Sequence, residues 1–191
     1  MVLLAVYSLV IASLVWARYR FFEFKSRKAK TLSRVYGPLV SIHIGGSFYY
    51  LFTAPEPTLY FCLIAIFLLL IGEMLFVSSI LTAKELDFAS SEEHSTLLDS
   101  GPFQFVRHPL YLSYSLIWLS TALLFNSPLL WITLGGLVVF YSFSAKREEE
   151  AILSSQYSGE YRRYKNRVGM FTPRISQWKS WILKLLSATK S

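Results

Sequence analysis

Five blocks of apolar residues constrain the fold of this chain more strongly than any short motif. They cover residues 1–17, 36–52, 59–81, 110–125 and 129–144, each close to the roughly 17–25 residues that a helix needs to cross a bilayer. The apolar residues form continuous runs, without the 2- or 3.6-residue rhythm of soluble strands and helices. Only 16% of the 191 residues are charged, against about 25% in soluble domains. The sequence therefore predicts an all-α, polytopic integral membrane protein with five transmembrane helices.

The distribution of Lys and Arg indicates how these helices are oriented. Segment 18–35 holds seven of them, segment 82–109 holds two and segment 145–191 holds ten, which together are all 19 in the chain. The N-terminal tip and the breaks at 53–58 and 126–128 hold none. Because basic loops stay in the cytoplasm, we expect the N-terminus outside and the three basic segments inside. The net charge of +7 then suits a membrane surface with anionic lipid headgroups, and nucleic acid is not an expected partner.

A single domain is predicted for residues 1–191, because the chain shows no repeat and no low-complexity linker. Its parts are N-terminal spans at 1–81, a region at 97–173 that contains the two polar segments described below, and an amphipathic helix at 174–191 that lies on the inner membrane surface. We expect such a protein in the inner membrane of a bacterial cell or in the endoplasmic reticulum membrane of a eukaryotic one.

Several common kinds of site are excluded by what the sequence lacks. Cys62 is the only cysteine, so no disulfide can form within the chain. The three histidines, His43, His94 and His108, have no neighbours at metal-ligand spacing, and no bound metal is expected. The nine glycines form no G-x-G-x-x-G pattern, which excludes a Rossmann-type cofactor site.

The segment GPFQFVRHPLY, residues 101–111, stands at the cytoplasmic mouth of the fourth span. Pro102 and Pro109 fix φ and remove backbone donors, so the segment is not expected to extend that helix. Arg107 and His108 are thereby held at the membrane interface, where their polar groups cost little. The alternative is that Arg107 extends its charged group to the lipid headgroups and Pro109 is an ordinary helix start, both common at the ends of spans.

The segment KREEEAILSSQYSGEYRRYKNRVGMFTP, residues 146–173, follows the fifth span. Spacings of 4, 4, 4 and 3 place one set of its residues on a single helical face: Glu149, Leu153, Tyr157, Tyr161 and Tyr164. This pattern predicts one continuous helix. A solvated run of charges is the alternative.

Together the two segments resemble a known family. GPF-x-x-VRHP-x-Y, followed by EE-x-x-L-x-x-x-Y-x-x-x-Y-x-x-Y-x-x-R-V, is similar over residues 97–173 to the isoprenylcysteine carboxyl methyltransferases. These are integral membrane enzymes that use S-adenosylmethionine (SAM). The resemblance implies that 97–173 is the cofactor-binding catalytic region. It also implies methyl transfer to a lipophilic acceptor, first of all a carboxylate such as that of an isoprenylcysteine. A phospholipid or thiol methyltransferase, an NADPH-dependent reductase of the related sterol group and a non-enzymatic scaffold are the alternatives.

The chemistry of SAM suggests a role for each polar residue of the two segments. Carboxylates such as Glu149 and Glu150 can accept hydrogen bonds from the ribose hydroxyls or the ammonium group. Arg107 or His108 can hold the carboxylate of the cofactor, the arginine with two parallel hydrogen bonds. Tyr111 offers a hydroxyl group and an aromatic face for a cation.

Two further groups complete the expected site. The backbone from Gln104 to Val106 is expected to read the adenine edge, because the flanking prolines leave its amides without helix bonds. A carboxylate acceptor needs a cation to orient it, and Arg167 is the first candidate and Arg163 the second, with headgroup binding as the alternative.

Glu73 is the only acidic residue within a predicted span. An intramembrane carboxylate indicates a functional site by default. A structural pair with His43 of the second span is the slightly favoured alternative.

Overall fold

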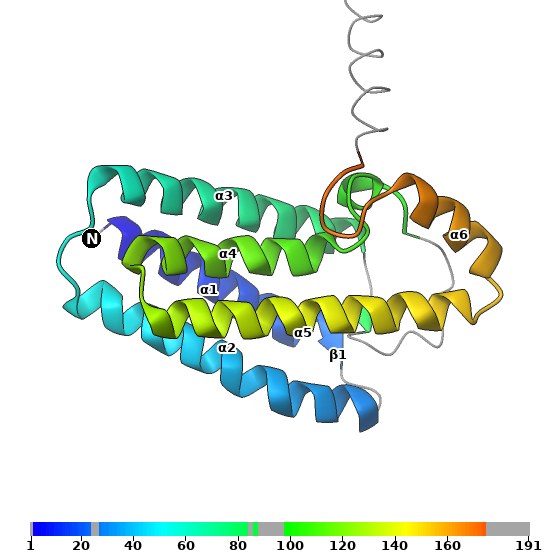
Figure 1. Ribbon diagram of the computed structural model, residues 1–191, viewed down its shortest axis with the longest axis horizontal. Coiled ribbons are helices and arrows are strands. Elements are labelled where there is room, and N and C mark those ends of the chain that lie inside the picture. Colours follow the sequence, from blue (N-terminus) through cyan, green and yellow to red (C-terminus); the bar gives the residue numbers. More distant parts are fainter. Residues whose placement is uncertain (1, 24–26, 84–85, 88–97, 175–191) are drawn as a thin grey trace, which may run out of the picture.

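The computed structural model describes residues 2–23, 27–83, 86–87 and 98–174. In these residues the chain is helical, apart from a two-residue parallel pair of β1 (Phe22–Glu23) and β2 (Leu86–Asp87) (Figure 1). The helices are α1 (Val2–Phe21), α2 (Arg27–Thr53), α3 (Leu59–Thr82), α4 (Pro109–Phe125), α5 (Pro128–Leu153) and α6 (Ser158–Arg167), with a short 3₁₀ helix, η1 (Gly101–Gln104), before α4.

Each of the five apolar blocks lies almost entirely within one long helix, α1 to α5. Among the residues that the structure describes, three helices are long and apolar enough to cross a membrane: α1, α3 and α5. Helix α4 is apolar but has only 17 residues. Helix α2 begins at Arg27, nine residues before the predicted span, and so includes a basic segment. Helix α5 likewise continues to Leu153, beyond the predicted end at residue 144, and so includes the three glutamates at 148–150.

Glycines allow the helices of the bundle to approach closely. A Cβ atom on Gly72 of α3 would lie 2.7 Å from Cγ1 of Ile117 and 3.1 Å from the carbonyl oxygen of Ser113, both in α4. A Cβ atom on Gly136 of α5 would lie 2.9 Å from Cδ2 of Leu39 in α2. Small residues at such contacts favour the van der Waals packing that associates helices in lipid.

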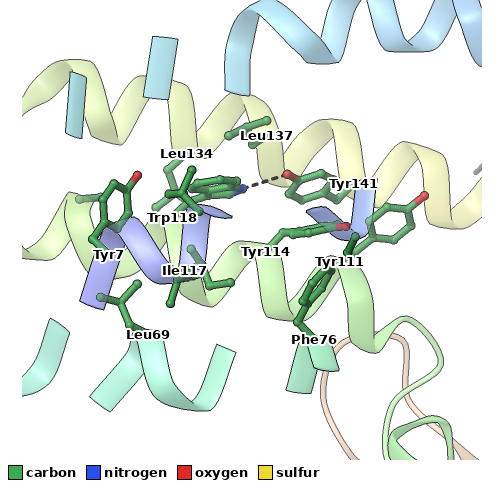
Figure 2. Close-up of a cluster of buried hydrophobic side chains, with 14 of the residues drawn as sticks. Tyr7, Leu69, Phe76, Tyr111, Tyr114, Ile117, Trp118, Leu134, Leu137 and Tyr141 are labelled. Atoms are coloured by element: carbon green, nitrogen blue, oxygen red, sulfur yellow. Dashed lines mark hydrogen bonds between the residues drawn. The ribbon is translucent and has the colours of Figure 1, made fainter. Parts of the chain in front are cut away.

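Aromatic side chains fill the interior between these helices (Figure 2). The indole N–H of Trp118 donates to the hydroxyl of Tyr141 at 2.9 Å, which satisfies both groups inside the bundle. The ring of Tyr111 stacks on that of Tyr141, with centroids 5.3 Å apart and an interplanar angle of 17°. The outer surface of the bundle is also apolar, with large exposed side chains that include Leu9, Leu70, Met74, Ile132 and Val139.

The polar segments gather at one end of the bundle. The start of α1, the turn between α2 and α3 and the turn between α4 and α5 lie at the opposite end (Figure 1). Helices η1 and α6 lie together at the end where α3 finishes and α4 begins. The predicted amphipathic helix at 174–191 lies outside the described residues, except for Arg174, and His94 lies outside them as well.

The predicted pair of Glu73 and His43 is wrong. Nδ1 of His43 lies 2.7 Å from Oγ1 of Thr133, and Nε2 lies 3.1 Å from Oγ1 of Thr121, so hydroxyls of α5 and α4 satisfy the ring. Glu73 instead lies beside Ser13 of α1. Antiparallel packing brings α3 against α4 and α1, which separates the carboxylate from His43.

Candidate functional site

The segment before α4 forms a compact turn that packs on the end of α3. Gly101 has a φ of +54°, a conformation that favours glycine. A Cβ atom there would lie 2.5 Å from Oγ1 of Thr82. After η1 the chain turns at His108, and Pro109 is the first residue of α4. The prediction that this segment does not extend α4 is therefore confirmed.

The backbone amides of this turn are not open as predicted. The N–H groups of Phe105 and Val106 both donate to the carbonyl oxygen of Pro102, at 3.1 and 3.3 Å. The 3₁₀ turn that Pro102 begins uses the donors that were expected to read an adenine edge. The side chain of Gln104 is exposed beside them.

The segment after the fifth span forms two helices, so the prediction of one continuous helix is wrong. Helix α5 ends at Leu153 and α6 begins at Ser158. The hydroxyls of Ser154 and Ser155 donate back to the carbonyls of Glu150 and Ile152, at 2.9 and 2.7 Å. Serine side chains that bond to nearby backbone compete with the helix ladder, and the chain reverses here.

The reversal packs α6 on the turn before α4. The buried side chains of Tyr161, Tyr164 and Val168 pack together against the end of α5. The hydroxyl of Tyr164 donates to the carbonyl oxygen of Phe103 at 2.6 Å. Helix α6 therefore joins the segment 146–173, of which it is part, to the segment 101–111.

Backbone hydrogen bonds connect these segments directly. The N–H groups of Arg107 and His108 donate to the carbonyls of Gly169 and Met170, at 2.8 and 3.1 Å. Val106 pairs with Gly169 in an isolated parallel bridge. A Cβ atom on Gly169 would lie 1.8 Å from the carbonyl oxygen of Thr172, so the turn beyond α6 requires glycine at this position.

Glu149 lies at the centre of a group of charged side chains. This ionic cluster comprises Arg107, His108, Glu148, Glu149 and Lys165. Only 2% of the Glu149 side chain is exposed. Its Oε1 accepts from Nε and Nη2 of Arg107 at 2.8 and 2.7 Å, and Nε2 of His108 lies 3.2 Å away. Its Oε2 lies 2.7 Å from Nζ of Lys165. Three cationic side chains thus compensate one buried carboxylate.

Glu148 connects the cluster to the aromatic interior. Its Oε2 lies 3.4 Å from Nδ1 of His108, and its Oε1 accepts a hydrogen bond from the hydroxyl of Tyr111. The rings of His108 and Tyr111 stack with centroids 5.9 Å apart. The two carboxylates therefore hold His108 from both nitrogens, and Glu148 also fixes Tyr111.

Arg107 connects the cluster to α6. Its Nη1 donates to the carbonyls of Val168 and Lys165 at the end of that helix. Unpaired carbonyls at a helix C-terminus carry partial negative charge and attract a cation. The guanidinium thereby holds Glu149 and α6 at once, so these donors are used within the protein, whereas the sequence suggested that Arg107 or His108 holds the carboxylate of the cofactor.

The two glutamates control the protonation of His108. Burial alone would lower the pKa of His108, because it disfavours the charged ring. The hydrogen bonds with Glu148 and Glu149 outweigh burial and raise the pKa above its ordinary value of 6.5. The two carboxylates thus favour the protonated form of the His108 ring.

The structure brings together only some of the predicted site residues. Arg107, His108, Tyr111 and Glu149 meet in or beside the ionic cluster, and Val106 joins through its backbone. The side chains of the other four are exposed: Gln104, Glu150, Arg163 and Arg167.

Helical periodicity explains why the adjacent glutamates differ. Tyr141, Ala145 and Glu149 are four residues apart and all are buried, so they continue the inward face of α5. Glu150 is about 100° further round the helix and is exposed. The chain reversal also brings Lys165, not Arg167, to the carboxylate.

Glu148 and Lys165 are functional candidates that were not predicted from the sequence. Glu148 follows Tyr141 by seven residues, two turns along the inward face of α5. Lys165 follows the buried Tyr161 by four residues on α6. The same periodicity, applied to α5, could have found Glu148. The contact of Lys165 with Glu149 depends on the chain reversal, which the spacing does not predict.

The charged groups of the cluster suit the amino-acid head of SAM. Oε2 of Glu149 already accepts an ammonium group, that of Lys165. Lys165 is the surface member of the cluster, with 39% of its side chain exposed, so it can exchange for a ligand more readily than Arg107. Two carboxylates and a displaceable cation match a zwitterionic head that carries both an ammonium and a carboxylate group.

Comparison with known families agrees with this chemistry. Residues 60–160, more than half of the chain, match the family model described as phospholipid methyltransferase. The matched region contains α4, α5 and every residue of the ionic cluster except Lys165. Neither the curated proteins nor the solved structures include a match. The chain therefore belongs to the phospholipid methyltransferase family, within the isoprenylcysteine carboxyl methyltransferase-like group, and is a multi-pass membrane methyltransferase that acts on a lipid.

Proposed function

We propose that the chain transfers a methyl group from SAM to a lipophilic acceptor that arrives from the bilayer. One observation carries the proposal. Side chains around the start of α4 contact Glu148 and Glu149 of α5, about 40 residues further along the chain, where the apolar helices end. A polar cofactor can reach this position from water, and an acceptor can reach it from lipid.

The residues of the ionic cluster would hold the cofactor. SAM supplies an electrophilic methyl group on a positively charged sulfur. Glu148 and Glu149 would accept hydrogen bonds from its ammonium and ribose hydroxyls, and Lys165 would turn from Glu149 to the carboxylate of the cofactor. Arg107 keeps Glu149 oriented through Nε and Nη2. Such positioning of reactants can lower a barrier by roughly 7–11 kcal/mol.

The proposal includes five membrane crossings with the N-terminus outside. The bundle end with η1 and α6 would then face the cytoplasm, where SAM is made available to the enzyme. This orientation follows from the placement of Lys and Arg in the sequence.

Two classes of acceptor are compatible with this function. The family description, phospholipid methyltransferase, favours a phospholipid, and an amine of its headgroup would be the group that receives the methyl. A carboxylate such as that of an isoprenylcysteine is already a nucleophile and needs only a cation to orient it. Arg167 and Arg163, both exposed on α6, would provide that cation.

Methyl transfer from labelled SAM by the purified protein tests the function. We expect label in a lipid product when phosphatidylethanolamine or a prenylcysteine is supplied, and none from the Glu149→Gln variant. SAM should also raise the thermal midpoint of the protein, whereas NADPH should not, because only a ligand of the folded state stabilises it. No product with either acceptor, or stabilisation by NADPH alone, would reject the proposal.

The arginines distinguish the acceptor classes. If the acceptor is a carboxylate, Arg167→Ala should retain SAM binding and lose most transfer, and Arg167→Lys should fail as well because it lacks the planar fork. Arg162→Ala, another exposed arginine of α6, is the matched control. Full activity of Arg167→Ala would exclude this role.

A further inference from the structure

The outward face of α5 is an apolar stripe that ends at an arginine. Its members follow one another at helical spacing, and all of them are exposed: Ile132, Gly135, Val139, Phe143 and Arg147. In a chain that spans a membrane, exposed apolar side chains at this spacing face lipid. Arg147 therefore stands where the lipid-facing surface of this helix ends.

The guanidinium of Arg147 lies back over the apolar stripe. Its Cζ atom is 5.6 Å from the centroid of the exposed Phe143 ring, one helical turn earlier in α5. An arginine that only reaches for water at this end of a span would extend in the opposite direction. Long side chains of a helix lean toward its N-terminus, and this one brings the positive charge to the level of the Phe143 ring.

The charge of Arg147 has no anionic partner in the part of the chain that the structure describes. The ion pairs of those residues belong to the ionic cluster, and none of them includes Arg147. A phosphate diester supplies a complementary anion, because it accepts two parallel hydrogen bonds from a guanidinium. At the end of a lipid-facing stripe, such a phosphate belongs to a membrane lipid whose acyl chains cover the apolar residues.

The ionic cluster begins at the next residue of α5. Glu148 lies about 100° further round the helix than Arg147, and 23% of its side chain is exposed. A lipid that is bound through its phosphate at Arg147 therefore has its headgroup beside the exposed edge of the cluster. Lys146 is exposed as well, but it lies about 160° from Glu148 around the helix.

We propose that Arg147 is a positioning residue that binds the phosphate of a phospholipid acceptor and places the headgroup at Glu148. This role rests on the proposed methyltransferase function, to which it adds a residue that holds the acceptor. Arg147 lies outside the ionic cluster, so cofactor binding should not depend on it. A lipid that is not methylated can carry the same phosphate, and the experiments below distinguish the two sources.

Lipid retention by the purified full chain tests the phosphate site without methyl transfer. The probes are phosphatidylglycerol and diacylglycerol with the same acyl chains, counted by native mass spectrometry. The wild type should prefer phosphatidylglycerol, and Arg147→Gln should reduce this preference about tenfold, the effect of one charge-assisted hydrogen bond. Arg147→Lys should keep part of it, because lysine retains the charge without the fork. Lys146→Gln, which removes a neighbouring charge, should leave it unchanged.

Kinetics with labelled SAM and phosphatidylethanolamine in mixed micelles test whether the bound phosphate is that of the acceptor. Arg147→Gln should raise KM for the lipid about tenfold. It should leave kcat and the stabilisation by SAM unchanged, because the phosphate contact is the same before and during transfer. Lys146→Gln should match the wild type in all three quantities.

These measurements separate the possible failures. An undiminished preference for phosphatidylglycerol in Arg147→Gln, or an equal loss in Lys146→Gln, would overturn the phosphate site. Reduced retention with an unchanged KM would identify a bystander lipid and overturn the positioning role, as would transfer to a prenylcysteine but not to phosphatidylethanolamine. A wild type that SAM does not stabilise would reject the methyltransferase, while lipid retention still decides whether Arg147 binds phosphate.

Discussion

Glu149 shows how one residue can serve both the fold and the site. Its buried carboxylate contacts Arg107 and His108 from the turn before α4 and Lys165 from α6. Removing one partner from such a group leaves an uncompensated buried charge, at a cost of roughly 3–5 kcal/mol. We therefore expect substitutions in the cluster to affect stability as well as ligand binding, and both quantities need to be measured.

The pH dependence of stability tests the position of His108. Its pKa is raised in the folded protein by the two glutamates. Its contribution to stability is therefore fully present below the unfolded pKa of 6.5 and is lost as pH rises through the raised folded value. The thermal midpoint should fall as pH increases over this window, and His108→Gln should remove that part of the slope. An identical slope in the variant would show that the two glutamates do not raise the pKa of His108.

At the scale of elements, the reversal after α6 depends on Gly169. A Cβ atom there would lie 1.8 Å from the carbonyl oxygen of Thr172. Gly169→Ala should move the strand-like segment that pairs with Arg107 and His108, with a loss of about 1–3 kcal/mol in unfolding free energy. Denaturation of the purified variant measures this loss.

Gly159 in α6 offers the matched control. Nothing lies within 4 Å of the Cβ position at Gly159. Alanine has the higher helix propensity, so Gly159→Ala should be neutral or gain up to about 1 kcal/mol. Equal effects of the two alanine substitutions would contradict the described turn at Gly169.

The helices were predictable from sequence because long apolar runs leave little choice in lipid. The break between α5 and α6 was not predictable, because the helical spacing from Glu149 to Tyr164 runs across residues 154–157 without interruption. There the hydroxyls of Ser154 and Ser155 bond to backbone carbonyls, and the chain reverses. Arg107 and Glu149 could be predicted as site residues because they lie within the two sequence motifs. Lys165 could not, because its contact exists only after the reversal.

The whole molecule has two chemically different ends. The turns at 54–58 and 126–127 join helices at one end, whereas the ionic cluster and α6 lie at the other. In a Cys62→Ala background, single cysteines at Thr58 and Asn166, both exposed, should react oppositely with an impermeant thiol reagent in intact cells. We expect labelling at residue 58 and protection at 166. Equal labelling at both sites would refute the proposed orientation.

Calorimetry of SAM binding tests the central claim most directly. The purified wild type should bind SAM, and Glu149→Gln should bind it about ten- to a hundredfold more weakly, as expected for the loss of one charge-assisted hydrogen bond. Tyr111→Phe, which frees Glu148 from its hydroxyl partner, should weaken binding less. Glu160→Gln, an exposed carboxylate of α6, is the control and should bind as the wild type does. Thermal midpoints of the same samples show that each variant is folded. Wild-type affinity in a folded Glu149→Gln protein would contradict the assignment of the ionic cluster as the cofactor site.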